Sequence, residues 1–181
     1  MGKFIIGLII GILLVPFGFW VYVRSGSAPV AVADPQMPFE HYFAKTAEHA
    51  RINRDMQKCP IAADESAYLA GAQIYKENCA ECHGYVNKKM TPGPMFPIPP
   101  QLLQGKGVTD NPPGETFWKV QNGIRLSGMP AFSDRLSTDQ MWQVSLLLAN
   151  ANKLPDSATQ ALTYTPPAPA VSDPGEAVDK K

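Results

Sequence analysis

Residues 79–83 read CAECH, and they place two cysteines and a histidine side by side. The chain of 181 residues contains only three cysteines and three histidines, so this grouping is not a by-product of composition. Cysteines three positions apart occupy neighbouring positions of a helical turn, and His83 follows at the end of that turn. The stretch therefore predicts a site at which sulfur and imidazole groups act together.

Four kinds of site use these residue types. The C-x-x-C-H pattern marks covalent attachment of haem c, with Cys79 and Cys82 as thioethers and His83 as an iron ligand. A zinc site would add Cys59, but adjacent side chains such as Cys82 and His83 seldom converge on one tetrahedral ion. A dithiol redox site would need a thioredoxin-like βαβ context, which the sequence lacks. A structural disulfide is the fourth alternative. We expect haem c as the cofactor.

An iron atom held by one histidine needs a ligand at its sixth position. Met129 stands between a glycine and a proline in SGMPAF (residues 127–132), a setting that favours a tight extended loop. It lies far enough beyond His83 to reach the opposite haem face. We therefore expect His83 and Met129 to be the metal ligands. The alternatives are Met90, Met95, Met141, His41 and His49.

The surrounding sequence predicts an all-α domain over 66–154. One helix begins with Ser66 as its expected N-cap and runs toward Cys79, and a second covers 113–124 and is ended by Gly123. A capping box opens a third, apolar helix at Ser137. The loop of about 25 residues after His83 holds too many prolines for a helix or a central strand. These helices offer few large side chains for a core, which favours a large apolar prosthetic group at the centre.

The N-terminal segment predicts a membrane helix. Residues 4–23 carry no charged side chain, and as a helix they would span about 30 Å, the thickness of a bilayer's hydrocarbon core. A cleaved signal peptide is the alternative, because AVA at 31–33 is a small-x-small site. The apolar run is longer than a signal h-region and ends well before Ala33, so we expect a retained anchor over 1–24.

The other segments complete the expected organisation of the chain. Residues 25–65 form a linker with a short amphipathic helix over 38–57, and residues 155–181 form a disordered Pro/Ala-rich tail. The 16 basic and 16 acidic residues balance, so nothing favours a nucleic acid as partner.

With CAECH near their start and GMPAF downstream, residues 66–154 resemble a class I c-type cytochrome, the small mono-haem family. The resemblance implies a small cytochrome c fold of three to four helices around one covalent haem, here with an N-terminal transmembrane helix. It also implies a crossing of the first and last helices, for which Gly71, Tyr75 and Trp142 are the matching positions.

The resemblance further implies a proline carbonyl that accepts a hydrogen bond from the ligand histidine. Pro100, with Leu102 as the apolar residue two positions on, is the best match for this cofactor-binding role, and other nearby prolines leave other registers open. The arm over 25–65, Cys59 and the tail are departures about which the family implies nothing.

These features favour a membrane-tethered electron carrier, because His/Met ligation raises the haem potential and leaves no open site. We expect it to carry single electrons between a quinol-oxidising complex or dehydrogenase and a terminal oxidase or reductase. Its location would be the cytoplasmic (inner) membrane of a bacterium, single-pass, with the haem domain facing the periplasm. Its partners would be the membrane and redox proteins, with no small-molecule substrate and no catalytic residue, so we do not expect an enzyme.

Two other functions remain open at this point. One is the cytochrome subunit of a larger membrane or periplasmic oxidoreductase, with the helix over 38–57 as its docking element. The other is a haem enzyme or sensor, which would need an open sixth position. A docking patch of basic residues around the haem edge is a further hypothesis, with ordinary solvated side chains as its alternative; its members would be Lys88, Lys89, Lys106, Lys119 and Arg125.

Overall fold

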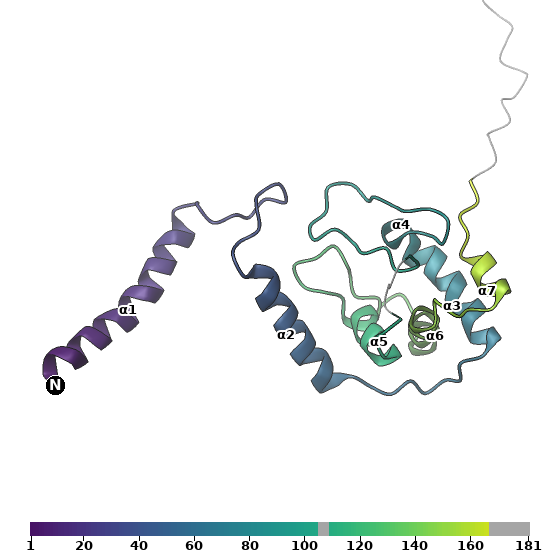
Figure 1. Cartoon of the computed structure of the whole chain (residues 1–181), viewed down its shortest axis with the longest axis horizontal. Coiled ribbons are helices and arrows are strands. Elements are labelled where there is room, and N and C mark those ends of the chain that lie inside the picture. The colour runs from purple at the N-terminus through teal and green to yellow at the C-terminus, as the bar shows by residue number, and fades with distance from the viewer. Residues whose placement is uncertain (105–108, 167–181) are drawn as a thin grey trace, which may run out of the picture. The chain divides into compact units, whose positions relative to one another are not determined.

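The computed structural model describes residues 1–104 and 109–166 (Figure 1). Within these residues all regular structure is helical and no strand occurs, which confirms the predicted all-α class. The chain divides into two compact units, Met1–Arg51 and a second that begins at Ile52. The helices are α1 (Gly2–Arg24), α2 (Glu40–Asp55), α3 (Glu65–Asn78), α4 (Ala80–His83), α5 (Pro113–Asn122), α6 (Thr138–Ala149) and α7 (Asp156–Ala161).

The first unit begins with α1, which contains the predicted apolar run 4–23. None of its residues is buried, and its mean hydropathy is 2.6, so it is long and apolar enough to cross a membrane. A helix that is apolar all round needs an apolar environment, either a protein core or lipid. At its C-terminal end the guanidinium of Arg24 lies 5.4 Å from the centre of the Trp20 ring, a cation–π contact.

The amphipathic helix predicted over 38–57 is present as α2, but the linker ends earlier than expected. Ile52, in the last turns of α2, is only 1 % exposed and opens the second unit. Cys59 and Ile61 pack against the hydrophobic core. A Cβ atom on Gly114, in α5, would collide with the carbonyl oxygen of Gln57, so the chain before α3 lies directly against α5. The second compact unit therefore begins at Ile52, upstream of the boundary expected at residue 65.

The second unit is built on the crossing of α3 and α6. A Cβ atom on Gly71 would lie 2.5 Å from the carbonyl oxygen of Gln143 and 3.0 Å from Leu147 Cβ, so only glycine permits this approach. Tyr75 and Trp142, the other two positions predicted for the crossing, are both buried in the core. Phe117 of α5 stacks on Trp142 with ring centres 3.9 Å apart, which brings α5 onto the same core.

Local capping follows the sequence, with one correction. The capping box of Ser137 and Gln140 is present at the start of α6, and Gly123 ends α5 as predicted. The cap of α3 is Asp64 rather than Ser66: its carboxylate accepts a hydrogen bond from the backbone N–H of Ala67 at 2.9 Å. Both residues are good N-caps, and the aspartate precedes the serine on the chain.

The segment after residue 154 is not the uniformly disordered tail that the composition predicts. Residues 156–161 form α7, where Ala158 is fully buried, and Leu162 just after it joins the core. The Ser157 hydroxyl donates a hydrogen bond to Glu65 in α3 at 2.6 Å. The domain therefore extends past the expected boundary at 154, while the part of the predicted tail from residue 167 lies outside the described residues.

We predict that Gly71→Ala lowers the free energy of unfolding by about 1–3 kcal/mol, because the added methyl group forces α3 away from the α6 backbone. Guanidinium denaturation followed by far-UV circular dichroism measures the loss. Gly93→Ala is the matched control, since a Cβ atom there would meet nothing within 4 Å. Equal stabilities of the two variants would contradict the close crossing.

Candidate functional site

The residues of CAECH form a single helical turn at the end of α3. The backbone N–H of His83 donates to the carbonyl of Cys79 at 2.9 Å, and that of Gly84 donates to Ala80 at 2.9 Å. Gly84 then reverses the chain with a φ of 79°, in the left-handed region that favours glycine. Figure 1 shows this turn, α4, as a short continuation beside α3. Cys79, Cys82 and His83 therefore lie on one helical turn, as the sequence predicted.

The ring of His83 is fixed by a hydrogen bond. His83 Nδ1 lies 2.8 Å from the carbonyl oxygen of Pro100, the residue predicted from the sequence. A carbonyl only accepts, so Nδ1 carries the proton and Nε2 keeps its lone pair. Burial lowers the pKa of His83, with the bond to Pro100 acting weakly in the opposite direction. The imidazole is therefore neutral and presents Nε2 as a metal-binding atom.

Tyr75 holds the same turn from the side of the core. Its hydroxyl, buried in α3, donates a 2.8 Å hydrogen bond to the carbonyl oxygen of Gly84. Burial raises the pKa of Tyr75 far above its ordinary value, with the neighbouring Cys79 as a smaller cause. The hydroxyl thus stays protonated and keeps donating. The crossing of α3 and α6 is in this way connected to the residue next to His83.

Gln101 closes the loop that follows the turn, and the sequence analysis did not assign it a role. Its side-chain oxygen accepts from the backbone N–H of Met90 at 3.0 Å, and its amide nitrogen donates to the Met90 carbonyl at 2.9 Å. The same side chain fills the space in front of Gly84. The backbone N–H of Leu102 donates to the carbonyl of His83 at 3.2 Å. In the sequence, Gln101 is marked only as a single polar residue between Pro100 and the apolar pair Leu102 and Leu103, which does not predict this role.

The surroundings of the cysteines favour none of the three rival sites. None of them forms a disulfide, and the described residues contain no cluster of three or more Cys, His, Asp or Glu suited to a metal ion, so the zinc set with Cys59 is not assembled. Burial, and to a lesser degree Cys82, raises the pKa of Cys79 to about 12. A thiol that stays protonated at neutral pH is a poor redox nucleophile. Cys59 instead points its thiol toward the carbonyl of Ile61 at 3.6 Å.

Met129 lies in a loop that is pressed against the end of α5. Gly123 has a φ of 68°, and a Cβ atom on it would lie 2.7 Å from Ala131 N and 2.9 Å from the carbonyl oxygen of Met129. The backbone N–H of Ile124 donates to that carbonyl at 3.2 Å, and Met129 N–H donates to Ser127 Oγ at 3.1 Å. The Met129 side chain is half-buried against the core. Its backbone is therefore held tightly, as a ligand loop requires.

The other candidates for the sixth position are placed differently. The Met95 side chain lies against Gly128, the residue before Met129. Met90 is tied by its backbone to Gln101, and Met141 is buried in the core as part of α6. His41 and His49 belong to the first unit and are exposed. Among these alternatives, Met95 is the residue whose side chain packs against the loop of Met129.

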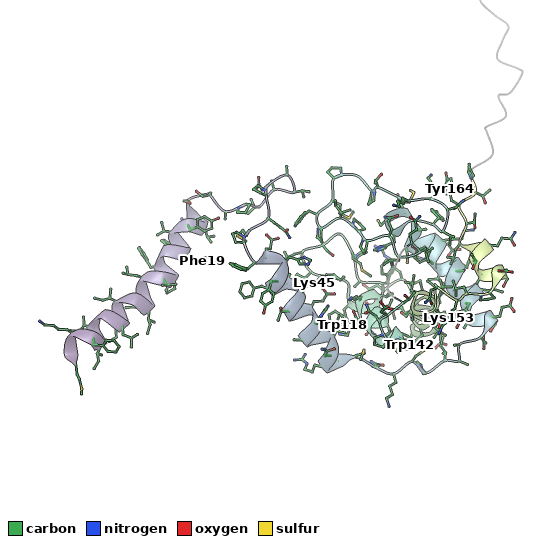
Figure 2. All side chains as sticks on the ribbon, viewed as in Figure 1. Phe19, Lys45, Trp118, Trp142, Lys153 and Tyr164 are labelled. Carbon is green, nitrogen blue, oxygen red and sulfur yellow. The ribbon has the colours of Figure 1, made fainter. Side chains whose placement is uncertain are left out.

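The five basic residues of the proposed docking patch are not equivalent. Lys88 Nζ lies 3.6 Å from the centre of the Tyr164 ring, which Figure 2 labels beyond α7. Lys119 pairs with Glu115 at 2.8 Å. Lys89 and Arg125 are exposed, and Lys106 lies outside the described residues. Two of the five are thus engaged within the domain, which weakens the patch as a single docking surface.

Comparison with known proteins identifies the second unit. Residues 66–146 match the family model described as cytochrome C oxidase, cbb3-type, subunit III. A stretch of 97 residues is 30% identical to the cbb3-type cytochrome c oxidase subunit FixP of Sinorhizobium medicae (strain WSM419), covering 49% of this chain and 32% of that protein. Residues 66–146 form a c-type cytochrome domain. The chain spans only about a third of the length of this curated relative.

Two solved structures also resemble the chain. One is the reducing HAO-like protein complex Kustc0457/Kustc0458 of Kuenenia stuttgartiensis, with a TM-score of 0.40, 23% identity, and coverage of 51% of this chain and 46% of that one. The other is cytochrome CL of Methylophaga aminisulfidivorans MPT, with a TM-score of 0.37, 16% identity, and coverage of 74% and 81%.

A c-type cytochrome domain binds haem c covalently, and the arrangement of side chains suits this group. The neutral His83 ring presents an unprotonated nitrogen, and two thiols share its helical turn. Apolar side chains border the core without being fully covered, as a surface that receives an apolar ring system would require; they are Tyr85, Leu102, Leu103 and Met129.

We predict that Tyr75→Phe lowers the free energy of unfolding of the cytochrome domain by about 1–3 kcal/mol, since it leaves the Gly84 carbonyl without its buried donor. Chemical denaturation monitored by the haem absorption reports the change beside His83. Tyr164→Phe is the control, because its ring and its backbone hydrogen bonds to Asn87 remain. An unchanged midpoint for Tyr75→Phe would show that the hydroxyl does not hold the turn.

Proposed function

We propose that this chain is a membrane-tethered mono-haem c-type cytochrome that carries single electrons. Electrons would pass from a quinol-oxidising complex or a dehydrogenase to a terminal oxidase or reductase. Cys79 and Cys82 would hold the group by thioether bonds, and His83 and Met129 would bind its iron. When bound, the haem iron supplies one-electron chemistry between its ferric and ferrous states. The proposal assigns the chain no catalytic residue.

The hydrogen bond between His83 and Pro100 is the observation that carries this proposal. It fixes the tautomer and the ring orientation, and a carbonyl acceptor increases the basicity of the nitrogen that binds the metal. A thioether such as that of Met129 is a soft ligand, and Met/His ligation raises the reduction potential of haem iron. A filled sixth position favours electron transfer over binding of a small molecule. These properties suit a carrier.

A second function is favoured by the family match. The matching family model and the S. medicae relative are both described as components of cbb3-type cytochrome c oxidases. This supports the alternative that the chain is the cytochrome subunit of a larger membrane or periplasmic oxidoreductase. Both functions use the same haem site and the same electron chemistry. They differ in whether the cytochrome stays bound to its redox partner.

We place the chain in the cytoplasmic membrane of a bacterium, crossed once by α1, with the haem domain on the periplasmic side. Haem is attached to c-type cytochromes outside the cytoplasm, so the domain has to be translocated. α1 has the length and hydropathy for one crossing. The tether raises the local concentration of the domain near membrane partners.

Met129→Ala tests the sixth ligand. We predict that the variant keeps its covalent haem, loses the weak red absorption of iron–methionine bonding in the oxidised protein, and binds carbon monoxide when reduced. Met129→His should restore six-coordination and lower the reduction potential. Potentiometric titration and optical spectra measure these changes.

Met95→Ala is the matched control, because Met95 is the other half-buried thioether of this region. We expect it to keep the red absorption band. If Met95→Ala removed the band and Met129→Ala retained it, the ligand would come from the loop after His83 instead. A band retained in both variants would exclude both methionines.

Affinity purification of the full chain from detergent-solubilised membranes separates the two functions. A carrier should elute alone, because redox encounters use small, short-lived interfaces, whereas a subunit should elute with a partner in fixed ratio. Intact mass of the same sample tests the anchor: we predict residues 1–33 present together with one haem. A chain that begins at Asp34 would refute the tether and leave the haem assignment untouched.

A further inference from the structure

The first unit carries three exposed aromatic side chains at the start of α2. Phe39, Tyr42 and Phe43 are 73, 64 and 66 % exposed. Tyr42 and Phe43 lie in the first turn of α2 with ring centres 5.7 Å apart, and Phe39 directly precedes the helix. Ala47 and Ala50 continue the side of Phe43. Isolated exposed apolar residues are ordinary, but three adjacent large rings form a patch that a protein in water seldom leaves uncovered.

The linker before α2 turns back onto the end of α1. Tyr22 of α1 lines one hollow together with Met37 and Pro38, the last residues before the aromatic patch. The turns are tied by hydrogen bonds: Asp34 accepts from the backbone N–H groups of Val30 at 2.9 Å and Ala31 at 2.8 Å. Because Met37 and Tyr22 share this hollow, the chain that leads into α2 passes the C-terminal end of the apolar helix.

That end of α1 has the composition of a membrane interface. Trp20 and Tyr22 are the residue types that concentrate at the boundary between headgroups and acyl chains, and Arg24 suits the headgroup region. A segment that lines a hollow with Tyr22 therefore lies near the depth of the lipid headgroups. The aromatic patch follows that segment, in the same unit as α1.

We propose that the aromatic patch at the start of α2, formed by Phe39, Tyr42 and Phe43, docks into the headgroup–acyl boundary of the bilayer that α1 crosses. This inference rests on the membrane tether of the proposed function. Aromatic residues on an amphipathic helix bury at this boundary while the opposite side stays in water. Lys45 lies about 200° around the helix from Phe43 and about 60° from Tyr42, so it borders the patch on the side away from Phe43, where its charge reaches water and anionic headgroups.

A lipid surface fits the patch better than a protein groove. Tyr42 combines an apolar ring with a hydroxyl, the amphipathic character that interfacial positions select. The rings are followed on the same side by two alanines, so the face is bulky only at the end near α1. A protein groove would be matched by a further large anchor at the i+7 position, which here is Thr46.

Site-specific photocrosslinking tests this docking. The full-length holoprotein is placed in nanodiscs of phosphatidylcholine and phosphatidylglycerol, with benzoylphenylalanine in place of Leu13, Phe43 or Lys45 in separate variants. We expect lipid adducts, measured by mass spectrometry, at Leu13 and Phe43, with about fivefold or more over Lys45 because only one side of α2 meets the acyl boundary. The visible haem spectrum of each variant checks that the cytochrome domain is intact.

Four outcomes would overturn the docking. Equal lipid adducts at Phe43 and Lys45 would show that α2 has no preferred side toward the bilayer. Adducts at Phe43 to protein alone, whether a second copy or the same chain, would assign the patch to a protein contact. Absence of lipid adducts at Leu13 would remove the tether itself, and with it the docking, whereas adducts at Leu13 without any at Phe43 would remove the docking alone.

Discussion

The hydrogen bond from His83 Nδ1 to the Pro100 carbonyl joins the two parts of the chain that the cofactor site requires. One part is a rigid helical turn with two cysteines, and the other is the far end of a proline-rich loop. Without the bond, an imidazole at the end of a short helix would be free to rotate and to change tautomer. With the bond, Nδ1 is protonated and donates to Pro100, and Nε2 is left to bind a metal.

This bond holds only because the elements around it are fixed independently. Gly71 allows α3 to lie directly on α6. Tyr75, on the same helix, fixes the position of Gly84 by its hydrogen bond to the Gly84 carbonyl. On the other side, Gln101 ties the middle of the loop to its end through both backbone groups of Met90. His83 is therefore held between a packed core and a closed loop, as a redox site with little reorganisation requires.

Segments on both sides of the family match also pack into the domain. Ile52 and Cys59 before α3 and Leu162 after α7 are buried or packed on the core, although the match covers only 66–146. Three modest helices and long loops bury little apolar surface by themselves, and these flanking segments supply more. Tyr164 lies against Tyr85 with ring centres 5.2 Å apart, so the C-terminal segment also braces the loop next to the haem-attachment turn.

The sequence by itself determined the features whose residues are close together along the chain. The attachment turn, the capping box at Ser137, the glycine that ends α5 and the apolar run of α1 follow from short, fixed spacings, because local hydrogen bonds and helix periodicity leave a readable pattern. The hydrogen bond from His83 to Pro100 was predicted because the resemblance to a family implied a proline carbonyl as the partner of the histidine. The assignment of Met129 as an iron ligand remains a prediction, which rests on its tight loop.

Tertiary structure alone decided the contacts between distant segments. Ser157 bonds to Glu65, Gln57 lies against Gly114, and Met95 lies against Gly128. Such pairs have no periodicity, and each residue alone is compatible with a solvent-exposed loop. The composition around α7, rich in proline and alanine, predicts disorder, yet Ala158 and Leu162 are buried because a matching surface on the core is present. Burial depends on the partner surface, and no local pattern encodes that surface.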